Sequence, residues 1–224
     1  MLLAIDTATF RASIALHDGI ALRGECTWEA ANAHTVTLAA HIADLLRQTE
    51  ITVTDLKGIA VCIGPGSYTG VRIGMAMAKG LALSQQLPLV GVPTLDILAE
   101  GQPPDDRPLY AIFAAGRRRV GYARYQFREG GWHVATEIAL ASWEELLPRI
   151  ETPALVVGEI DAPGRKALES LGVTLTLPPA AWHLRRAGFL AEIAWRQLRK
   201  RARPGQTEVP AQLVPLYASG QGAG

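Results

Sequence analysis

The segment Gly64–Gly74, with the sequence GPGSYTGVRIG, constrains the fold of this chain more than any other stretch. It follows the apolar run Lys57–Ile63, which has the length and composition of a buried strand, and its glycines and proline end that strand. Ser67 or Thr69 can cap a helix that continues to about Gln86. A buried strand, a tight turn and a helix in succession are typical of α/β folds.

The glycine-rich turn has two interpretations, and the sequence leaves both open. Amide groups at a helix N-terminus favour an anion, which Gly66 and Ser67 would contact. A tight strand–helix turn needs the same glycine dihedral angles without any ligand. Two known motifs are excluded. No Gly-Lys-Ser/Thr follows, as a Walker phosphate loop requires, and Pro65 stands where a G-x-S-x-G nucleophile elbow has glycine.

A second candidate for anion chemistry lies at the end of the first apolar run, Leu2–Asp6. Asp6, Thr7 and Thr9 could hold a cation–phosphate complex through their carboxylate and hydroxyl oxygens. The same residue types cap amide groups in an ordinary turn between two strands. Spacing alone favours the turn.

The order of elements predicts two lobes of similar construction. Three short apolar runs open the chain, and the dipeptide Asp18-Gly19 is a strong turn signal between the second and third. Beyond the proline-rich segment Gln102–Pro108 the order returns, which predicts a duplicated α/β unit with lobes at 1–104 and 105–182. A final helix at about 183–203 is expected to pack on the first lobe. The predicted meander strands are Leu2–Asp6, Ser13–Leu16, Ile20–Thr27, Leu109–Ala114, Val120–Phe127 and Trp132–Leu140.

The helix after the glycine-rich turn is apolar on more than one face. Small residues recur along it every four positions, at Gly70, Gly74, Ala78 and Ala82. Small side chains let another helix approach closely, so we expect one face to pack on the chain's own sheet and the other on a partner. A fully internal helix is the alternative.

The overall charge does not mark the chain as a nucleic-acid binder, because 22 basic residues balance 21 acidic ones. Two local clusters remain, Arg117–Arg119 and the terminal helix with its flank, His183–Arg203. They either contact nucleic-acid phosphates or, in the helix, complement the negative end of the helix dipole.

Several other functions are excluded by spacing. His34 and His41 stand seven apart rather than four, so no metal site is predicted, and no nucleophile–histidine pair or carboxylate couple suggests catalytic residues. Cys26 and Cys62 lie in apolar runs, so we expect both to be small buried residues. Unpaired cysteines of this kind are consistent with a reducing cytosol. The N-terminus lacks a basic region and no apolar run reaches about 18 residues, so we expect a cytoplasmic protein without membrane association.

The motifs combine into a pattern that resembles the TsaB (YeaZ) family. They are AIDTAT at 4–9, HT at 34–35, GPGSYTGVRIG at 64–74, KGLAL at 79–83 and GVPTL at 91–95. The resemblance is strong over residues 1–100 and weak beyond 105. It implies an actin/Hsp70-like ATPase (ribonuclease H-like) α/β fold, with two lobes that each hold a mixed sheet and flanking helices.

The resemblance also implies a non-catalytic paralogue of TsaD. TsaD is the subunit that forms N6-threonylcarbamoyladenosine at position 37 of tRNAs reading ANN codons. Its metal-binding H-x-x-x-H motif is absent here, since Leu38 stands four after His34. No cofactor of its own is implied, and ATP or ADP would bind only in the complex.

Partners are implied in the same way. The two helices after the first meander, about 35–48 and 69–86, would dock onto TsaD, with the ATPase TsaE joining and tRNA reached indirectly. A homodimer would use a similar surface, and the sequence does not choose between monomer and homodimer. The implied docking residues are His34, Leu38, Ile42, Tyr68, Gly70, Val71, Gly74, Met75 and Ala78.

One departure and one alternative accompany the resemblance. Family members often carry an aspartate in the strand that opens the second lobe, whereas residues 112–122, IFAAGRRRVGY, hold no carboxylate. The alternative function is an ATP-dependent enzyme of the same superfold, such as a small-molecule kinase, for which AIDTAT and the glycine-rich turn are the motivation.

Overall fold

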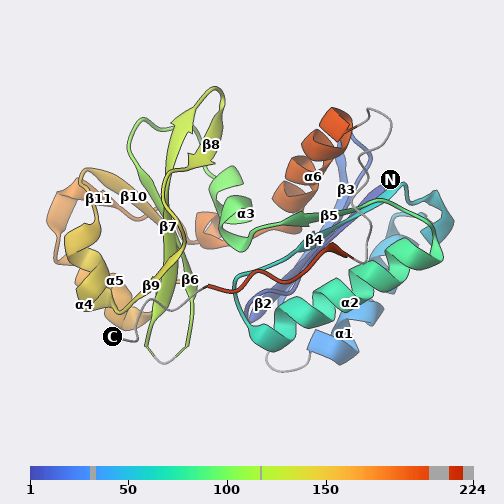
Figure 1. Ribbon diagram of the computed structural model, residues 1–224, viewed down its shortest axis with the longest axis horizontal. Helices are drawn as coiled ribbons and strands as arrows, with labels where there is room; N and C mark the ends of the chain where they lie inside the picture. The colour runs from blue at the N-terminus through green and yellow to red at the C-terminus, as the bar shows by residue number, and fades with distance from the viewer. Residues whose placement is uncertain (31–33, 117, 202–211, 219–224) are drawn as a thin grey trace. The chain divides into compact units, whose positions relative to one another are not determined.

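The computed structural model describes residues 1–30, 34–116, 118–201 and 212–218 (Figure 1). The chain divides into two units. Unit 1 comprises Met1–Ile97 and Arg186–Leu216, and unit 2 comprises Leu98–Arg185 with the chain end from Tyr217. The division falls inside a helix, α3 (Thr94–Glu100), shortly before the proline-rich segment where the sequence places it.

The sheet of unit 1 has the strand order β3-β2-β1-β4-β5. β1 (Leu2–Asp6) is antiparallel to β2 (Arg11–His17), and β2 is antiparallel to β3 (Leu22–Glu29). β1, β4 (Gly58–Cys62) and β5 (Leu89–Val92) run parallel. The meander followed by a parallel extension agrees with the predicted element order.

Helices cover both faces of this sheet, which explains why β1 is buried throughout. One set of alternating side chains packs under α1 (His34–Gln48) and α2 (Tyr68–Ser84), and the other set packs under α6 (Ala187–Arg201). Figure 1 shows α1 and α2 on one side of the strands and α6 on the other. The two helical layers of unit 1 therefore present separate outer surfaces.

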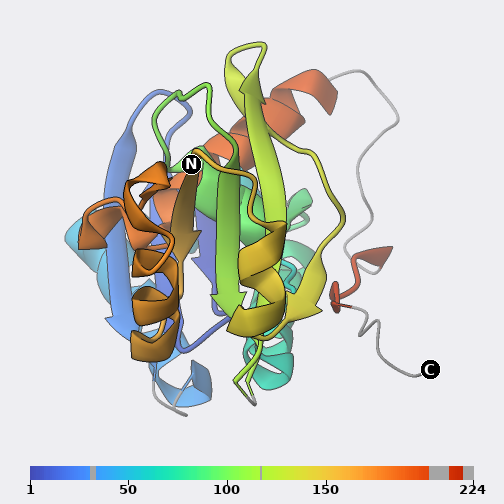
Figure 2. The same ribbon diagram turned by 90° about the vertical axis from the view of Figure 1, so that its left-hand side faces the viewer.

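Unit 2 is built around β6 and β7, the long central strands in Figure 2. Its strand order is β11-β10-β6-β7-β8, and β9 also pairs with β7. β6 and β7 are antiparallel, while β6, β10 and β11 run parallel. The strand bounds are β6 (Leu109–Ala114), β7 (Val120–Arg128), β8 (Gly131–Val134), β9 (Ala139–Ala141), β10 (Ala154–Gly158) and β11 (Leu175–Thr176).

The remaining elements of unit 2 are short. α4 (Trp143–Leu146) and α5 (Ala162–Glu169) begin at the capping residues Ser142 and Asp161, whose side chains accept bonds from amides of the first turn. The described 3₁₀ turns of the chain are η1 (Val53–Asp55), η2 (Leu147–Arg149), η3 (Gly172–Thr174) and η4 (Ala180–His183). Each unit thus combines a mixed sheet with flanking helices, and the predicted α/β class is confirmed.

One predicted strand is wrong. Trp132–Leu140 was expected to be continuous, but it forms β8 and β9, which pair with different parts of β7. Between them, the amide of Ala135 donates to the carbonyl of Arg124 at 2.7 Å, and the hydroxyl of Thr136 accepts from the amide of Arg124 at 3.0 Å. These bonds hold the intervening residues out of the regular ladder.

Candidate functional site

The two motifs that the sequence singled out, AIDTAT and the glycine-rich turn, lie against each other in unit 1. The amide of Ser67 donates to the carbonyl of Ala8 at 2.6 Å, and the hydroxyl of Thr7 donates to the carbonyl of Gly70 at 2.7 Å. The hydroxyl of Ser67 in turn accepts from the amide of Gly70 and caps α2. The start of α2 is therefore fixed to the turn between β1 and β2.

No side chain fits at three glycines of this region, because other atoms of the chain lie directly over them. A Cβ atom on Gly66 would lie 2.0 Å from the carbonyl oxygen of Ala8, and one on Gly70 would lie 2.2 Å from that of Thr7. On Gly74 it would lie 2.2 Å from the hydroxyl oxygen of Thr7. The ridge of small residues thus accommodates the chain's own β1–β2 turn.

This geometry corrects the predicted docking ridge. Gly70, Val71, Gly74, Met75 and Ala78 are all buried on the face of α2 that covers the sheet. A partner cannot reach these side chains while α2 lies on its sheet. This side of α2 is therefore an internal face, which was the alternative that the sequence left open.

The same correction applies to α1. Leu38 and Ile42 are buried in the core beneath α1 and α2 and are not surface residues. Tyr68 is different, since it is 57% exposed and its ring lies 3.8 Å from the guanidinium of Arg72. His34 is the first residue of α1, and its side chain lies outside the part of the chain that the structure describes.

A second row of small residues lies on the opposite side of α2, and the sequence reasoning missed it. Ala76 and Gly80 are exposed and stand four apart, so they share one face with Arg72 and with Leu83, which is 60% exposed. On the neighbouring helix α1, three small residues are exposed as well: Ala39, Ala40 and Ala43. We call these residues, together with Tyr68, the outer α1/α2 face.

Gly80 is the most informative residue of this face. It lies in the interior of α2, and nothing comes within 4 Å of the position that its Cβ would occupy. A glycine inside a helix costs about 1 kcal/mol relative to alanine. No contact among the described residues requires a glycine at this position. Close approach of another backbone would require one.

The predicted anion-binding residues are engaged in contacts of the turn itself. Asp6, Thr7 and Thr9 are at most 3% exposed. A carboxylate oxygen of Asp6 accepts from the amide of Ala8 at 2.9 Å, and the hydroxyls of Thr7 and Ser67 bind Gly70. These contacts support the turn interpretation, and nucleotide binding stays a prediction.

In unit 2, Glu159 brings a carboxylate to the end of β6, where residues 112–122 have none. Its Oε2 accepts from the amide of Ala114 at 2.9 Å, and its Oε1 accepts from Nη1 of Arg185 at 3.1 Å. Both side chains are at most 10% exposed. The parallel pairing of Gly158 with Ile112 places Glu159 there, which the linear sequence does not reveal.

Neither a metal centre nor a membrane-spanning helix is found in the part of the chain that the structure describes. No three His, Cys, Asp or Glu side chains in these ranges are grouped as metal ligands would be. Nor is any helix in them long and apolar enough to span a membrane.

Comparison with known proteins places this geometry in context. The family model described as "TsaD: tRNA N6-adenosine threonylcarbamoyltransferase" matches residues 27–194. The tRNA threonylcarbamoyladenosine biosynthesis protein TsaB of Bacillus subtilis is 33% identical over 85% of both chains. The protein of that name from Escherichia coli is 38% identical over 59% of this chain and 58% of its own.

Solved structures agree with these relatives. YeaZ from Pseudomonas aeruginosa is 26% identical and superposes with a TM-score of 0.75, covering 96% of this chain and 98% of its own. Component A of the (R)-2-hydroxyglutaryl-CoA dehydratase of Acidaminococcus fermentans shares the fold with a TM-score of 0.53 at 14% identity, covering 90% and 99%. The actin-like fold predicted from the resemblance is confirmed.

Proposed function

The chain belongs to the TsaB (YeaZ) family of tRNA threonylcarbamoyladenosine biosynthesis proteins, and from this premise we propose that it is a non-catalytic partner of a TsaD-type subunit. In this role it supports the formation of N6-threonylcarbamoyladenosine at position 37 of tRNAs that read ANN codons. A TsaE-type ATPase joins the assembly. The TsaD-type subunit carries out the transfer, and any nucleotide binds within the complex.

The outer α1/α2 face is the docking surface in this proposal. The observation that carries it is Gly80, an exposed glycine in the middle of a helix with open space above it. Ala76 on α2 and the exposed alanines of the neighbouring α1 are further small residues of this face, and Leu83 and Tyr68 add exposed apolar area. Helices can pack closely on such a surface.

The experiment is a substitution on the exposed side of α2. Ala76→Arg should weaken binding of the TsaD-type subunit at least about thirtyfold, because a bulky cation would be trapped between two closely packed helices. The matched control is Ala162→Arg, at the exposed start of α5 in unit 2. Binding is measured by titration calorimetry, and circular dichroism checks that both variants fold.

Two results would contradict the proposal. Undiminished binding by Ala76→Arg would exclude the outer α1/α2 face as the docking surface. Threonylcarbamoyladenosine formed by the isolated chain, detected by mass spectrometry of digested tRNA, would exclude the non-catalytic role.

A further inference from the structure

Exposed cations gather at one end of unit 1, where three segments distant in sequence meet. α6 contributes Arg196, Arg199 and Lys200, which lie at three- and four-residue spacing on one side of its last turns. Lys57 precedes β4, and Arg23 lies near the start of β3. We call these five residues the basic end of unit 1.

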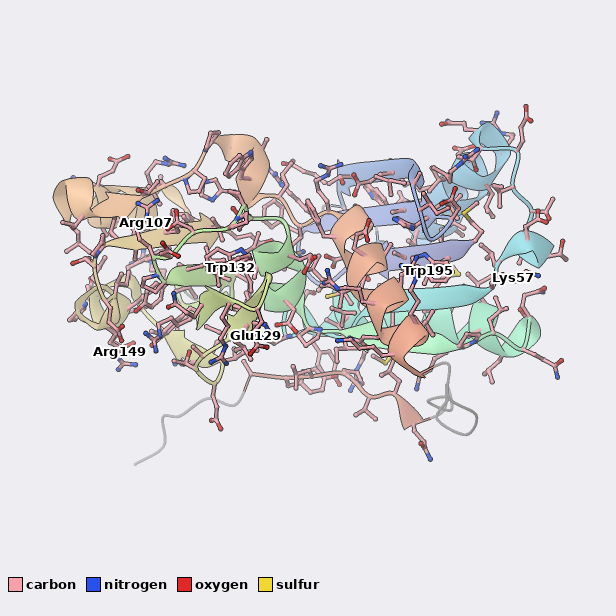
Figure 3. All side chains as sticks on the ribbon, turned by 90° about the horizontal axis from the view of Figure 1, so that it is seen from above. Lys57, Arg107, Glu129, Trp132, Arg149 and Trp195 are labelled. Carbon is pink, nitrogen blue, oxygen red and sulfur yellow. The ribbon has the colours of Figure 1, made fainter. Side chains whose placement is uncertain are left out.

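Contacts within unit 1 show that these segments are neighbours. A Cβ on Gly58, next to Lys57, would lie 3.3 Å from Cδ1 of Leu198 in α6. Nη2 of Arg199 donates to the carbonyl of Gly19 in the β2–β3 turn. Figure 3 labels Lys57 and Trp195, which belong to two of these segments.

The amino group of Met1 adds to the positive charge. Lys57 and Met1 are joined by a backbone hydrogen bond of 2.6 Å. Partial burial and the nearby charge of Lys57 lower the pKa of the Met1 amino group, an effect that Asp18 and Asp55 oppose. The Met1 amino group thus lies beside Lys57 at the same end of unit 1.

Three carboxylates of the described residues lie beside this end, and each has a partner of its own. Glu192, one turn before Arg196 in α6, lies 2.8 Å from Nε2 of His17. Asp18 accepts from the amides of Ile20 and Ala21 and lies 3.6 Å from Nη1 of Arg23. Asp55 accepts from the amide and hydroxyl of Thr52. Five cationic side chains against these three carboxylates still leave an excess of positive charge, on a chain that is nearly neutral overall.

The helix dipole does not account for this arrangement. Cations in the last turns of α6 complement the dipole of that helix. Lys57 and Arg23 lie outside α6, so the dipole gives no reason for them to gather at the same place. A polyanion with regularly spaced charges, such as the phosphate backbone of RNA, would contact all three segments together.

We infer that the basic end of unit 1 binds the phosphate backbone of tRNA. The inference rests on the proposed function, which makes tRNA the polyanion available to the assembly. α6 covers the opposite face of the sheet from α1 and α2, so the tRNA and the TsaD-type subunit would occupy different surfaces of unit 1. The contacts are to phosphates, so they strengthen binding without selecting a tRNA sequence.

The test removes charge at the basic end and leaves α1 and α2 unchanged. The variant K57Q/R196Q/K200Q is compared with the control R128Q/R165Q/K166Q, which removes three exposed cations from unit 2. Each is purified in complex with the TsaD-type subunit and titrated into a fluorescently labelled transcript of an ANN-reading tRNA, at salt concentrations between about 50 and 200 mM.

The basic-end variant should bind tRNA about tenfold or more weakly at low salt, and the slope of log affinity against log salt should fall by about two to three. The control should change affinity less than about twofold. Equal losses in both variants, or unchanged binding by the first, would overturn the inference. Weaker pairing of the first variant with TsaD at unchanged tRNA affinity would also overturn it, because it would mark this end as a protein-binding surface.

Failure of the proposed function would be seen separately. If the unmodified chain does not pair with the TsaD-type subunit, the docking proposal fails, and the same titration with the isolated chain still tests the basic end.

Discussion

Gly70 and Gly80 lie on opposite sides of α2 and are glycines for different reasons. The backbone of the β1–β2 turn passes over Gly70, so a Cβ there would lie 2.2 Å from the carbonyl oxygen of Thr7. A backbone atom cannot move aside as a flexible side chain can. Gly80 faces open space, and its lack of a side chain only weakens the helix.

The same substitution at the two sites should therefore have opposite effects. Gly70→Ala should lower the free energy of unfolding by about 1–3 kcal/mol, as overpacking does, whereas Gly80→Ala should raise it by about 1 kcal/mol through better helix propensity. Urea unfolding followed by circular dichroism measures both. Effects of the same sign would contradict the account of α2 given above.

Sequence reasoning reached only part of this result. The four-residue spacing from Gly70 to Ala82 correctly indicated one smooth face, but it could not show which side meets the sheet. That depends on Thr7, which is 63 residues away from its partner Gly70. Ala76 and Gly80 have the same spacing on the other side, and only burial separates the two rows.

At the scale of elements, a single histidine attaches the turn η4 to the sheet of unit 2. Nδ1 of His183 accepts from the amide of Gly158, at the end of β10, at 3.1 Å. Its Nε2 lies 2.9 Å from the carbonyl oxygen of Pro178 and donates to it, since a carbonyl can only accept. The imidazole must therefore be neutral, and burial, with a smaller effect of Arg165, lowers the pKa of His183.

This attachment should make stability depend on pH. A lowered pKa in the folded state means that the unfolded chain takes up the proton first, at about pH 6.5. The contribution of His183 is then present above that pH and is lost as the pH falls through the lowered pKa of the folded state. Free energies of unfolding, measured between pH 7 and 5, should fall less steeply for His183→Gln than for the unmodified chain.

The carboxylates provide the contrast for this measurement. Hydrogen bonds from Arg107 lower the pKa of Asp105, so its contribution is lost only at more acidic pH, below about 4. An unchanged slope in His183→Gln between pH 7 and 5 would exclude His183 as the source.

Sequence patterns predicted elements better than the contacts that join them. Apolar runs bounded by glycine, proline or aspartate correctly marked β1, β4 and β6. The break between β8 and β9 depends on side-chain and backbone bonds to Arg124, which periodicity does not report. Glu159 reaches the end of β6 through parallel strand pairing, so no local motif could show it.

At the scale of the whole molecule, adjacent arginines mark a point where the chain passes from unit 2 back to unit 1. Arg185 is bound to Glu159 within unit 2, and Arg186 is bound to Glu25 within unit 1. Glu25 also accepts from the amide of Gly188 at 2.7 Å, which holds the start of α6. The outer α1/α2 face and the basic end both belong to unit 1. Unit 1 would therefore bind both the TsaD-type subunit and tRNA.

Hydrogen exchange on the assembled complex should show this assignment. Adding the TsaD-type subunit should slow exchange in peptides from α1 and α2, and adding tRNA should slow exchange in peptides that contain Lys57 and the last turns of α6. Peptides from β6 and β7 should be unaffected in both cases. Protection confined to unit 2 would contradict both assignments.

The glycines of the Gly64–Gly74 segment pack against the chain's own residues, and this has an evolutionary consequence. Contacts within a single copy of the chain constrain this segment: backbone lies against Gly64, Gly66 and Gly70, and the Thr7 side chain lies against Gly74. The outer side of α2 carries no such internal constraint at Gly80. A descendant could exchange its partner, or lose it, by drift at Ala76, Gly80 and Leu83 while the diagnostic motif stayed intact. Membership of the family would then persist after the binding partner had changed. The residues at Ala76, Gly80 and Leu83 would indicate which partner a given member binds.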